Sequence, residues 1–446
     1  MKCVKVLVFI ILLMICSVNG YVWQSIIPPP RNMARMVIDS VNQRVILFGG
    51  SGLNCHWYND LWQMPLSDSS SFYWLQIRTS GTIPSGRGGC AFVYVPNQQK
   101  TYAICGDTFG NTGGLENEVW ALRLTRSAKS WQQLFPSGTP PVGRRQIEGI
   151  YHPGRNSIIF YCGEGQNYNY FDEVWELKLE PLSWHLITIS GSRPLARYGY
   201  GLAFDQNNNR MILFGGGKAD GTFSNEVWAL DLTVGSEHWT RLYPSGTSPV
   251  GRAGFAHGYN PYTNKLYIFG GWNYTGGYLF DDAFVLDIAN MMWMQINAAG
   301  VGPFERRNAC GTFDYFNNNF IVVGGDDGAT QIGDCYILDI DNSSASNPEW
   351  KPSLYLTLSP TIYISSSPGD VRIHYILPAA TKINIDILDI SGRIVNNIFS
   401  GKTDLATGLI SWDKKDIHNR QISAGTYFCR LATDEMSVTK KFVVVK

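Results

Sequence analysis

The sequence predicts an all-β protein, a six-bladed β-propeller followed by a small β-sandwich. Two observations predict the propeller: a hydrophobic run that ends in glycine recurs six times, and each recurrence has its own aromatic and arginine positions. A third observation predicts the sandwich: in the last part of the chain, about 90 residues, this repeat is replaced by alternating apolar and polar side chains. Charged residues make up 16% of the chain, against roughly 25% in an average soluble domain.

The balance of charge excludes one class of partner. The chain has 36 basic and 36 acidic residues, so its formal net charge is zero. Proteins that bind nucleic acid through its phosphates need an excess of basic groups on one face. We therefore expect no nucleic-acid partner.

Residues 1–20 have the pattern of a secretory signal peptide. Two lysines precede an apolar run over residues 6–16, and small residues stand before a cleavage site at Tyr21. The run is shorter than the roughly 20 residues that span a bilayer. Acylation of Cys16 is the alternative, although the bulky Ile15 precedes it. We expect an exported protein without an integral membrane segment.

Six repeats follow between residues 21 and 352. In each, a hydrophobic strand closes in a glycine pair or its remnant. The closing glycines are Gly50, Gly106, Gly163, Gly216, Gly271 and Gly325. The next strand places an acidic residue before an aromatic ring, as in 117–120, and a single tryptophan follows. A unit of four short strands and about 50 residues, repeated radially, is a propeller blade.

Closure of the ring is open at this point. Trp23 and Trp350 each begin a segment that reads as an outer strand, which is one strand too many for six blades. We expect one of them to complete the last blade and the other to lie in a linker. A seventh, composite blade is the alternative.

The glycine pair, the acidic-aromatic strand and the spaced tryptophan resemble the kelch family over residues 21 to about 352. Units two and three depart from the pattern with cysteine before the closing glycine, and the last two units have Phe284 and Tyr336 in place of the strand tryptophan. The resemblance implies a β-propeller.

Residues 353–446 resemble the Ig-like domain of flagellar hook-capping proteins and the C-terminal sorting domain of type IX secretion. Tyr375-x-Leu377-Pro378, the turn at 389–395 and the terminal strand carry the resemblance. It implies a bacterial exported protein, secreted or at the cell surface, whose tail contacts secretion or cell-envelope machinery. The usual Asn-Pro opening is missing, so a plain spacer domain is the alternative.

Strand order places the loops between strands 2 and 3 and between strands 4 and 1 on one face of a propeller. The 2–3 loops are rich in rings and amides, which suit a sugar or a peptide. The aromatic candidates for ligand binding are Trp57, Tyr58, Tyr168, Tyr170, Trp272 and Tyr274. The structural alternative is that these rings anchor their own loops.

An arginine opens each unit, and six of them could surround the mouth of the central channel. The candidates are Arg35, Arg87, Arg144, Arg197, Arg252 and Arg306. Guanidinium groups there would suit a carboxylate ligand. The alternative is that each arginine is bonded within its own blade, which the strict periodicity favours.

The sequence predicts a binding protein for a protein or a glycan. A carbohydrate-active enzyme on the same face is the alternative, because sialic-acid mutarotases and kelch-like copper oxidases share this architecture. The candidate acids for such an enzyme are Asp107, Glu148, Glu164 and Asp326. We assign no catalytic residue, no metal site and no cofactor, because the seven histidines are scattered over the chain.

Seven cysteines remain after the signal peptide, an odd number. Cys90 and Cys105 stand symmetrically about a predicted hairpin turn. Either a disulfide or two packed thiols would fit, since linkage requires matching Cβ positions.

Overall fold

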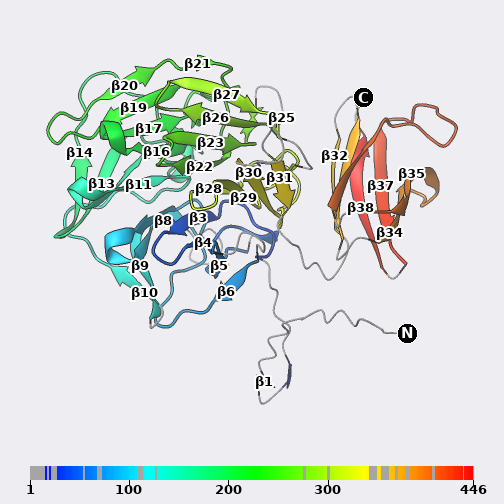
Figure 1. Ribbon diagram of the computed structural model, residues 1–446, viewed down its shortest axis with the longest axis horizontal. Helices are drawn as coiled ribbons and strands as arrows, with labels where there is room; N and C mark the ends of the chain where they lie inside the picture. Colours follow the sequence, from blue (N-terminus) through cyan, green and yellow to red (C-terminus); the bar gives the residue numbers. More distant parts are fainter. Residues whose placement is uncertain are drawn as a thin grey trace.

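The structure is a computed structural model with two β-domains, a ring of blades and a separate sandwich (Figure 1). It describes residues 16–17, 20–21, 28–53, 56–67, 73–108, 114–125, 128–274, 278–298, 302–340, 349–352, 361–366, 370–377, 381–403, 407–434 and 436–444. Apart from the short strands β1 (Cys16–Ser17) and β2 (Gly20–Tyr21), the predicted signal peptide lies outside these residues.

Six sheets form the ring, and each has four antiparallel strands in chain order; the short strand β21 (Ser245–Gly246) adds a parallel fifth strand to the fifth sheet. The first two blades contain β3 (Arg35–Asp39), β4 (Arg44–Phe48), β5 (Leu61–Pro65) and β6 (Leu75–Ile77), then β7 (Ala91–Val95), β8 (Lys100–Asp107), β9 (Leu115–Leu124) and β10 (Lys129–Leu134). The third and fourth contain β11 (Gly149–His152), β12 (Ser157–Tyr161), β13 (Val174–Leu179) and β14 (Leu182–Ile187), then β16 (Gly201–Asp205), β17 (Arg210–Phe214), β19 (Val227–Asp231) and β20 (Trp239–Leu242). The last two contain β22 (Ala256–Asn260), β23 (Lys265–Phe269), β26 (Ala283–Asp287) and β27 (Met292–Ile296), then β28 (Cys310–Asp314), β29 (Asn319–Val323), β30 (Cys335–Asp339) and β31 (Glu349–Pro352).

The ring also contains short elements outside the four main strands of each blade. They are the two-residue strands β15 (Arg197–Tyr198), β18 (Gly217–Lys218), β21 (Ser245–Gly246), β24 (Trp272–Asn273) and β25 (Tyr278–Leu279), and the 3-10 turns η2 (Pro96–Gln98), η3 (Pro153–Arg155), η4 (Gln166–Tyr168) and η5 (Gln206–Asn208). Strand β31, which carries Trp350, completes the sixth blade. The prediction of six blades is therefore confirmed for the described residues, and the seven-bladed alternative is wrong. The segment around Trp23 lies outside them.

Backbone hydrogen bonds close the ring without an exchanged strand. The N–H of Met33 in the first blade donates to the carbonyl of Asn308 in the sixth at 2.9 Å, and Gly89 donates to Met33 at 2.9 Å. On the other side Asn308 donates to Gly254, and Gly254 donates to Gly199. All five residues have a positive φ of about 55–62°, so the chain turns sharply at each of them and directs its N–H to the preceding blade.

Six apolar clusters fill the spaces between neighbouring blades in the described part of the ring. The tryptophan of an outer strand reaches into the preceding blade, where Trp131 lies 5.0 Å from Phe48 and Trp293 lies 4.7 Å from Phe214 between ring centroids. These large rings are what the repeated tryptophan contributes, because sheets packed face to face leave a gap that only bulky side chains fill.

The glycine pairs allow blades to approach one another closely. Gly49 has a φ of 68°, and a Cβ there would lie 2.3 Å from the carbonyl oxygen of Arg87 in the next blade. In the second and third blades Cys105 and Cys162 occupy this position with φ values of 61° and 56°. The departure noted in the sequence therefore keeps the same backbone conformation.

Cys90 and Cys105 are both buried and free, so the structure has no disulfide between them. Cys90 packs between the first and second blades, and Cys105 packs between the second and third. A shift in strand pairing after Ile104 turns the Cys105 side chain to the other face of its sheet. Burial raises the pKa of Cys90 to about 11 and that of Cys105 to about 12.

Two sheets pack face to face in the C-terminal domain. One contains β32 (Thr361–Ser366), β33 (Val371–Ile376) and β36 (Thr407–Trp412); the other contains β34 (Lys382–Leu388), β35 (Ile394–Lys402), β37 (Gly425–Ala432) and β38 (Ser437–Val444). One apolar cluster joins the two sheets. Two ion pairs connect this sandwich to the ring: the exposed Arg372 lies 2.9 Å from Asp281, and the partly buried Lys440 lies 3.9 Å from Asp327. Within the described residues, no helix has the length and apolar character needed to cross a membrane.

Candidate ligand-binding site at the channel mouth

Each blade buries one arginine between its glycine pair and the acidic residue of its third strand. We call these six side chains the arginine layer. They are Arg31, Arg87, Arg144, Arg197, Arg252 and Arg306, and none is more than 1% exposed. In every blade the Nη1 group donates to the first carbonyl of the glycine pair or its remnant, at 2.8–3.2 Å. The same guanidinium forms an ion pair with the acidic residue of that blade.

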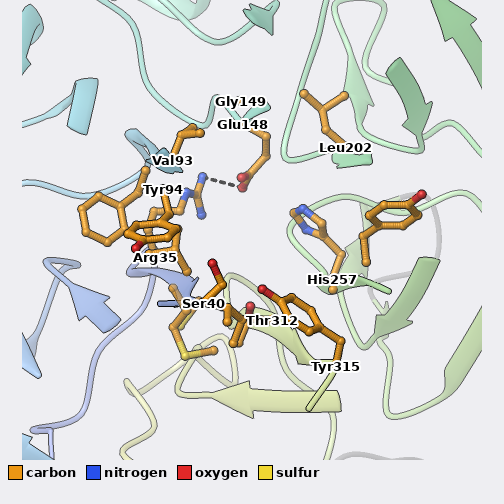
Figure 2. Close-up of a pocket in the computed structure, with 18 of the residues that line it drawn as sticks. Arg35, Ser40, Val93, Tyr94, Glu148, Gly149, Leu202, His257, Thr312 and Tyr315 are labelled. Carbon is orange, nitrogen blue, oxygen red and sulfur yellow. Dashed lines mark ion pairs between the residues drawn. The ribbon is translucent and has the colours of Figure 1, made fainter. Parts of the chain in front are cut away.

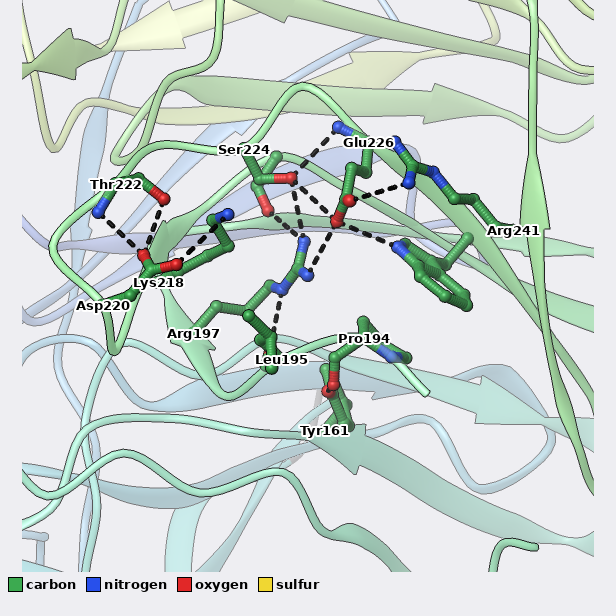
Figure 3. A network of polar contacts seen from close by, with 12 residues as sticks. Tyr161, Pro194, Leu195, Arg197, Lys218, Asp220, Thr222, Ser224, Glu226 and Arg241 are labelled. Carbon is green, nitrogen blue, oxygen red and sulfur yellow. Dashed lines mark hydrogen bonds and ion pairs between the residues drawn. The ribbon is translucent and has the colours of Figure 1, made fainter. Parts of the chain in front are cut away.

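The fourth blade shows the arrangement in detail (Figure 3). Arg197 donates to the carbonyl of Leu195 at 2.9 Å and pairs with Glu226 at 3.2 Å. Glu226 also accepts from the indole of Trp228 at 3.1 Å. Burial alone would raise the pKa of Glu226, but the bonds from Trp228 and Arg197 outweigh it, so the pKa is lowered. An Arg–acid ion pair thus recurs in every blade, and in the first four blades a tryptophan indole also donates to the acid.

The expectation that these arginines surround the mouth and bind a carboxylate is wrong. Their side chains are buried, and carboxylates of the protein already occupy the guanidinium groups. The assignment of the first arginine also changes. Arg31, not Arg35, belongs to the layer, and it precedes Gly50 by the same 19 residues that separate Arg306 from Gly325. Arg35 extends into the central channel instead.

The residues that do face the mouth follow the layer arginines by one position. Each pairs with the residue after the glycine pair of its own blade. These pairs are Asn32–Ser51, Gly88–Asp107, Arg145–Glu164, Tyr198–Gly217, Ala253–Trp272 and Arg307–Asp326. The side chains differ from blade to blade, unlike the layer beside them. The third to sixth blades supply the large ones, and we call the following set the mouth cluster: Arg145, Glu164, Tyr170, Tyr198, Trp272, Tyr274, Arg307 and Asp326.

Arg145 joins two blades through carboxylates. Its guanidinium lies 2.6 Å from Asp107 of the second blade and 2.6 Å from Glu164 of the third. Both carboxylates are at most 4% exposed, whereas the arginine is 28% exposed. Burial lowers the pKa of Arg145, but the bonds to Glu164 and Asp107 outweigh that effect and raise it. The charged group that solvent meets here is therefore the fixed guanidinium.

Arg307 makes a second fixed cation. Its Nε lies 2.7 Å from Asp326, and its guanidinium lies 5.2 Å from the centre of the Trp272 ring, a distance at which cation and ring attract. The amides of Asn32 and Asn308 also donate to Asp326, at 2.9 and 3.2 Å. The first, fifth and sixth blades thus contribute to one polar contact.

Rings lie between these two cations. Tyr170 and Tyr198 stack with centroids 5.2 Å apart and planes at 19°. Burial raises the pKa of Tyr198, and the charges of nearby Tyr170 and Glu164 add to that effect. Tyr274 lies edge-on to Trp272 at 4.1 Å and is 69% exposed. Tyr168, two residues before Tyr170 and next to the mouth cluster in the chain, is 73% exposed.

The other two aromatic candidates serve as anchors. Trp57 is 9% exposed and packs on Gly88, where an added Cβ would lie 2.7 Å from its ring. Tyr58 covers Arg31, with the guanidinium 4.3 Å from the ring centre. The structural interpretation fits these two, whereas Tyr168, Tyr170, Trp272 and Tyr274 leave ring surface for a ligand.

The four candidate acids all lie near arginines. Asp107, Glu164 and Asp326 belong to the mouth, and Glu148 lies deeper, 3.1 Å from Arg35. In the part of the chain that the structure describes, no three His, Cys, Asp or Glu side chains gather as metal ligands would.

Sequence reasoning missed Arg145, Tyr198 and Arg307. The available signal was variation: beside an arginine that recurs in all units, the next position holds a different side chain almost every time. The repeat pattern drew attention to the constant residue rather than to its variable neighbour.

The repeat region matches the family model described as KLHDC2/KLHL20/DRC7 Kelch-repeats domain over residues 8–199 and 155–354. The chain belongs to the kelch-repeat family. This kelch protein ends in a second matched unit, a secretion system C-terminal sorting domain over residues 362–445. That match indicates an exported protein, secreted or at the cell surface.

Relatives of this kelch protein share the repeat region. Kelch domain-containing protein 3 of Bos taurus is 27% identical over 344 residues, which are 73% of this chain and 86% of the relative. The flagellar outer-arm dynein alpha chain of Chlamydomonas reinhardtii is 26% identical over 279 residues, 57% of this chain, and the chain spans only 6% of that protein's length. The solved structure of YjhT superposes with a TM-score of 0.55 at 17% identity, over 73% of this chain and 99% of that one. This last likeness shows the fold alone.

Proposed function

We propose that this exported kelch protein is a binding protein that recognises a protein or a glycan with the mouth cluster. The observation that carries the proposal is the stacked pair Tyr170–Tyr198 between the fixed cations Arg145 and Arg307. A flat apolar surface flanked by oriented hydrogen-bonding groups suits the ring of a sugar or the side chains of a peptide.

The cluster is organised before a ligand arrives. Arg145 is held by two carboxylates and Arg307 by one, so neither side chain loses much freedom on binding. Arg145 and Arg307 together face three carboxylates, those of Asp107, Glu164 and Asp326, so the site offers donors and acceptors with little net charge. That combination supports a ligand recognised through hydroxyl or amide groups.

The sorting domain supports a place for this binding outside the cell or on its surface. We further propose that residues 353–446 contact secretion or cell-envelope machinery, as the matched sorting domain suggests.

The test is a screen of the full mature chain on glycan and peptide arrays, followed by titration of each hit. The double variant Tyr168→Ala/Tyr274→Ala should lose binding, because both rings are exposed at the mouth. Tyr243→Ala is the matched control, since this tyrosine is 78% exposed after strand β20 and outside the mouth cluster. Binding that the double variant retains in full would refute the proposal.

A carbohydrate-active enzyme, a sugar isomerase or an oxidase, remains the second candidate. Asp107 and Glu164 favour it, since two carboxylates converge on Arg145 at the mouth, and paired carboxyl groups can transfer protons. Incubation of a sugar hit with the protein, followed by NMR of its anomers and oxidation state, separates the two. If the protein turns a sugar over and Glu164→Gln abolishes this turnover, the protein is an enzyme rather than a binding protein.

A further inference from the structure

The central channel contains a cavity that the mouth cluster does not use. Innermost strands of the blades line it, and its volume is about 320 Å³ (Figure 2). Ser40 and Pro96 line it where β3 and β7 end, at the turns between strands 1 and 2. Pro96 is exposed. Because those turns lie opposite the 2–3 loops, the cavity opens on the other face of the ring.

An ion pair separates this cavity from the mouth. Arg35 of the first blade pairs with Glu148 of the third at 3.1 Å and also donates to the carbonyls of Cys90 and Ile147, at 2.9 and 3.2 Å. Four residues along from their layer arginines, the other blades have only small side chains: Ala91, Gly201, Ala256 and Cys310. Only the first and third blades place a large side chain at this level of the channel. The Arg35–Glu148 pair therefore lies between the mouth and the cavity and divides the channel into two sites.

His257 gives the cavity a polar group without a partner. Figure 2 shows its ring directed into the cavity beside Glu148. Within the described residues neither ring nitrogen forms a hydrogen bond, although the imidazole is half-buried. Desolvation lowers the pKa of His257, an effect that Glu148 opposes and Arg35 reinforces. The ring therefore stays neutral at pH 7 and presents one donor and one acceptor.

The remaining walls combine hydroxyl groups with apolar surface. Ser40, Thr312 and Tyr315 line one side, as Figure 2 shows, and Val93 and Leu202 line the cavity elsewhere. Arg35 and Glu148 neutralise each other, so a charged ligand would meet both an attractive and a repulsive group. The volume lies at the lower end of ligand pockets, which span roughly 300–1,000 Å³.

We propose that this cavity is a second binding site, separate from the mouth, for a small uncharged polyhydroxylated molecule the size of one sugar ring. The hydroxyl groups of the ligand bond to His257, Ser40 and Thr312, and its C–H face lies on the apolar wall. The proposal does not depend on what the mouth binds.

The probes are glucose, galactose, mannose and N-acetylglucosamine, with glucuronate and glucosamine as charged counterparts, each titrated at millimolar concentration into the full mature chain labelled with ¹⁵N-histidine. A neutral sugar should shift the His257 signals, assigned by their loss in His257→Phe. That variant keeps a ring of similar size but no nitrogen, and its affinity should fall about tenfold, as expected for one lost hydrogen bond.

Two further variants locate the site. Ser40→Trp narrows the opening and should abolish the shift, whereas Tyr168→Ala/Tyr274→Ala at the mouth should leave it unchanged. Thermal unfolding shows whether each variant is folded. If His257→Phe does not fold, the Ser40→Trp variant alone tests where the sugar binds. No shift with any neutral sugar, equal binding of the charged sugars, or loss of binding in the mouth variant would each overturn the proposal.

Discussion

Arg306 and Arg307 are neighbours in the chain, yet they have different surroundings. Arg306 is fully buried and pairs with Asp334, which is also fully buried. Arg307 is 29% exposed and pairs with Asp326 at the mouth. Arg144 and Arg145 show the same contrast in the third blade. One charge of each pair holds a blade together, and the other is presented to solvent.

The difference shows where this repeat can vary. Every blade needs its layer arginine, because this buried guanidinium bonds both the first carbonyl of the glycine pair and the acidic side chain, and buried polar groups need such partners. The next position is held by a backbone bridge, which depends little on the side chain. That side chain is therefore free to differ between blades, and the positions that differ are those that face the mouth.

The largest expected effect tests the buried member of the pair. Arg306→Ala should lower the free energy of unfolding of the propeller by about 3–5 kcal/mol, because it leaves Asp334 as a buried charge without its partner. Urea denaturation followed by tryptophan fluorescence measures this loss.

Arg307→Ala is the matched control. Asp326 would keep its bonds from the amides of Asn32 and Asn308, so the loss should be about 1 kcal/mol. Equal losses in the two variants would break the distinction between a structural and a recognition arginine.

A second effect, of intermediate size, concerns pH. The pKa of His257 is lowered by desolvation, so the unfolded chain binds this proton more readily than the folded one. The contribution of neutral His257 to the free energy of unfolding is fully present above the unfolded pKa of about 6.5, and it is lost as the pH falls below that value. Stability should therefore decrease on acidification, and less steeply in His257→Phe. The measurement is the midpoint of urea unfolding of the wild type and of His257→Phe, each followed from pH 7.5 to 5. If the two midpoints fall by the same amount with pH, the assignment of this pH dependence to His257 is wrong.

The smallest effect is expected between the domains. Arg372 and Asp281 are 45% and 48% exposed, so Arg372→Ala should change stability by less than about 1 kcal/mol and less again in high salt. Differential scanning calorimetry of the full chain in low and high salt checks this. A loss of several kcal/mol would mean that the sandwich supports the ring in the way that the arginine layer does.

The blades were predictable because their signals are local. Glycine pairs, acidic-aromatic strands and single tryptophans recur within each unit, and each is needed wherever one sheet packs on the next. The place of Arg31 in the arginine layer was also predictable, since its spacing to Gly50 matches that of the other units. Arg35, which is closer to Gly50, was assigned instead. The Cys90–Cys105 pairing failed because a local shift in strand pairing reverses one side chain.

The mouth cluster was not predictable in the same way. Tyr198 meets residues from neighbouring blades only because the ring closes, and these lie more than 25 residues away in the chain. Whether a loop ring is an anchor also depends on its neighbour. Trp57 is covered because Gly88 leaves room for it, whereas Tyr274 has no such recess and stays exposed.

The most direct test of the central claim, that variable positions around a constant arginine layer form the binding site, is titration calorimetry of an array hit. Three proteins are compared: the wild type, Tyr274→Ala and Tyr243→Ala. The account predicts that Tyr274→Ala weakens binding at least about fivefold, since a ring contact is worth about 1 kcal/mol or more, while its unfolding free energy and the Tyr243→Ala affinity stay unchanged. Equal affinity in all three would contradict it.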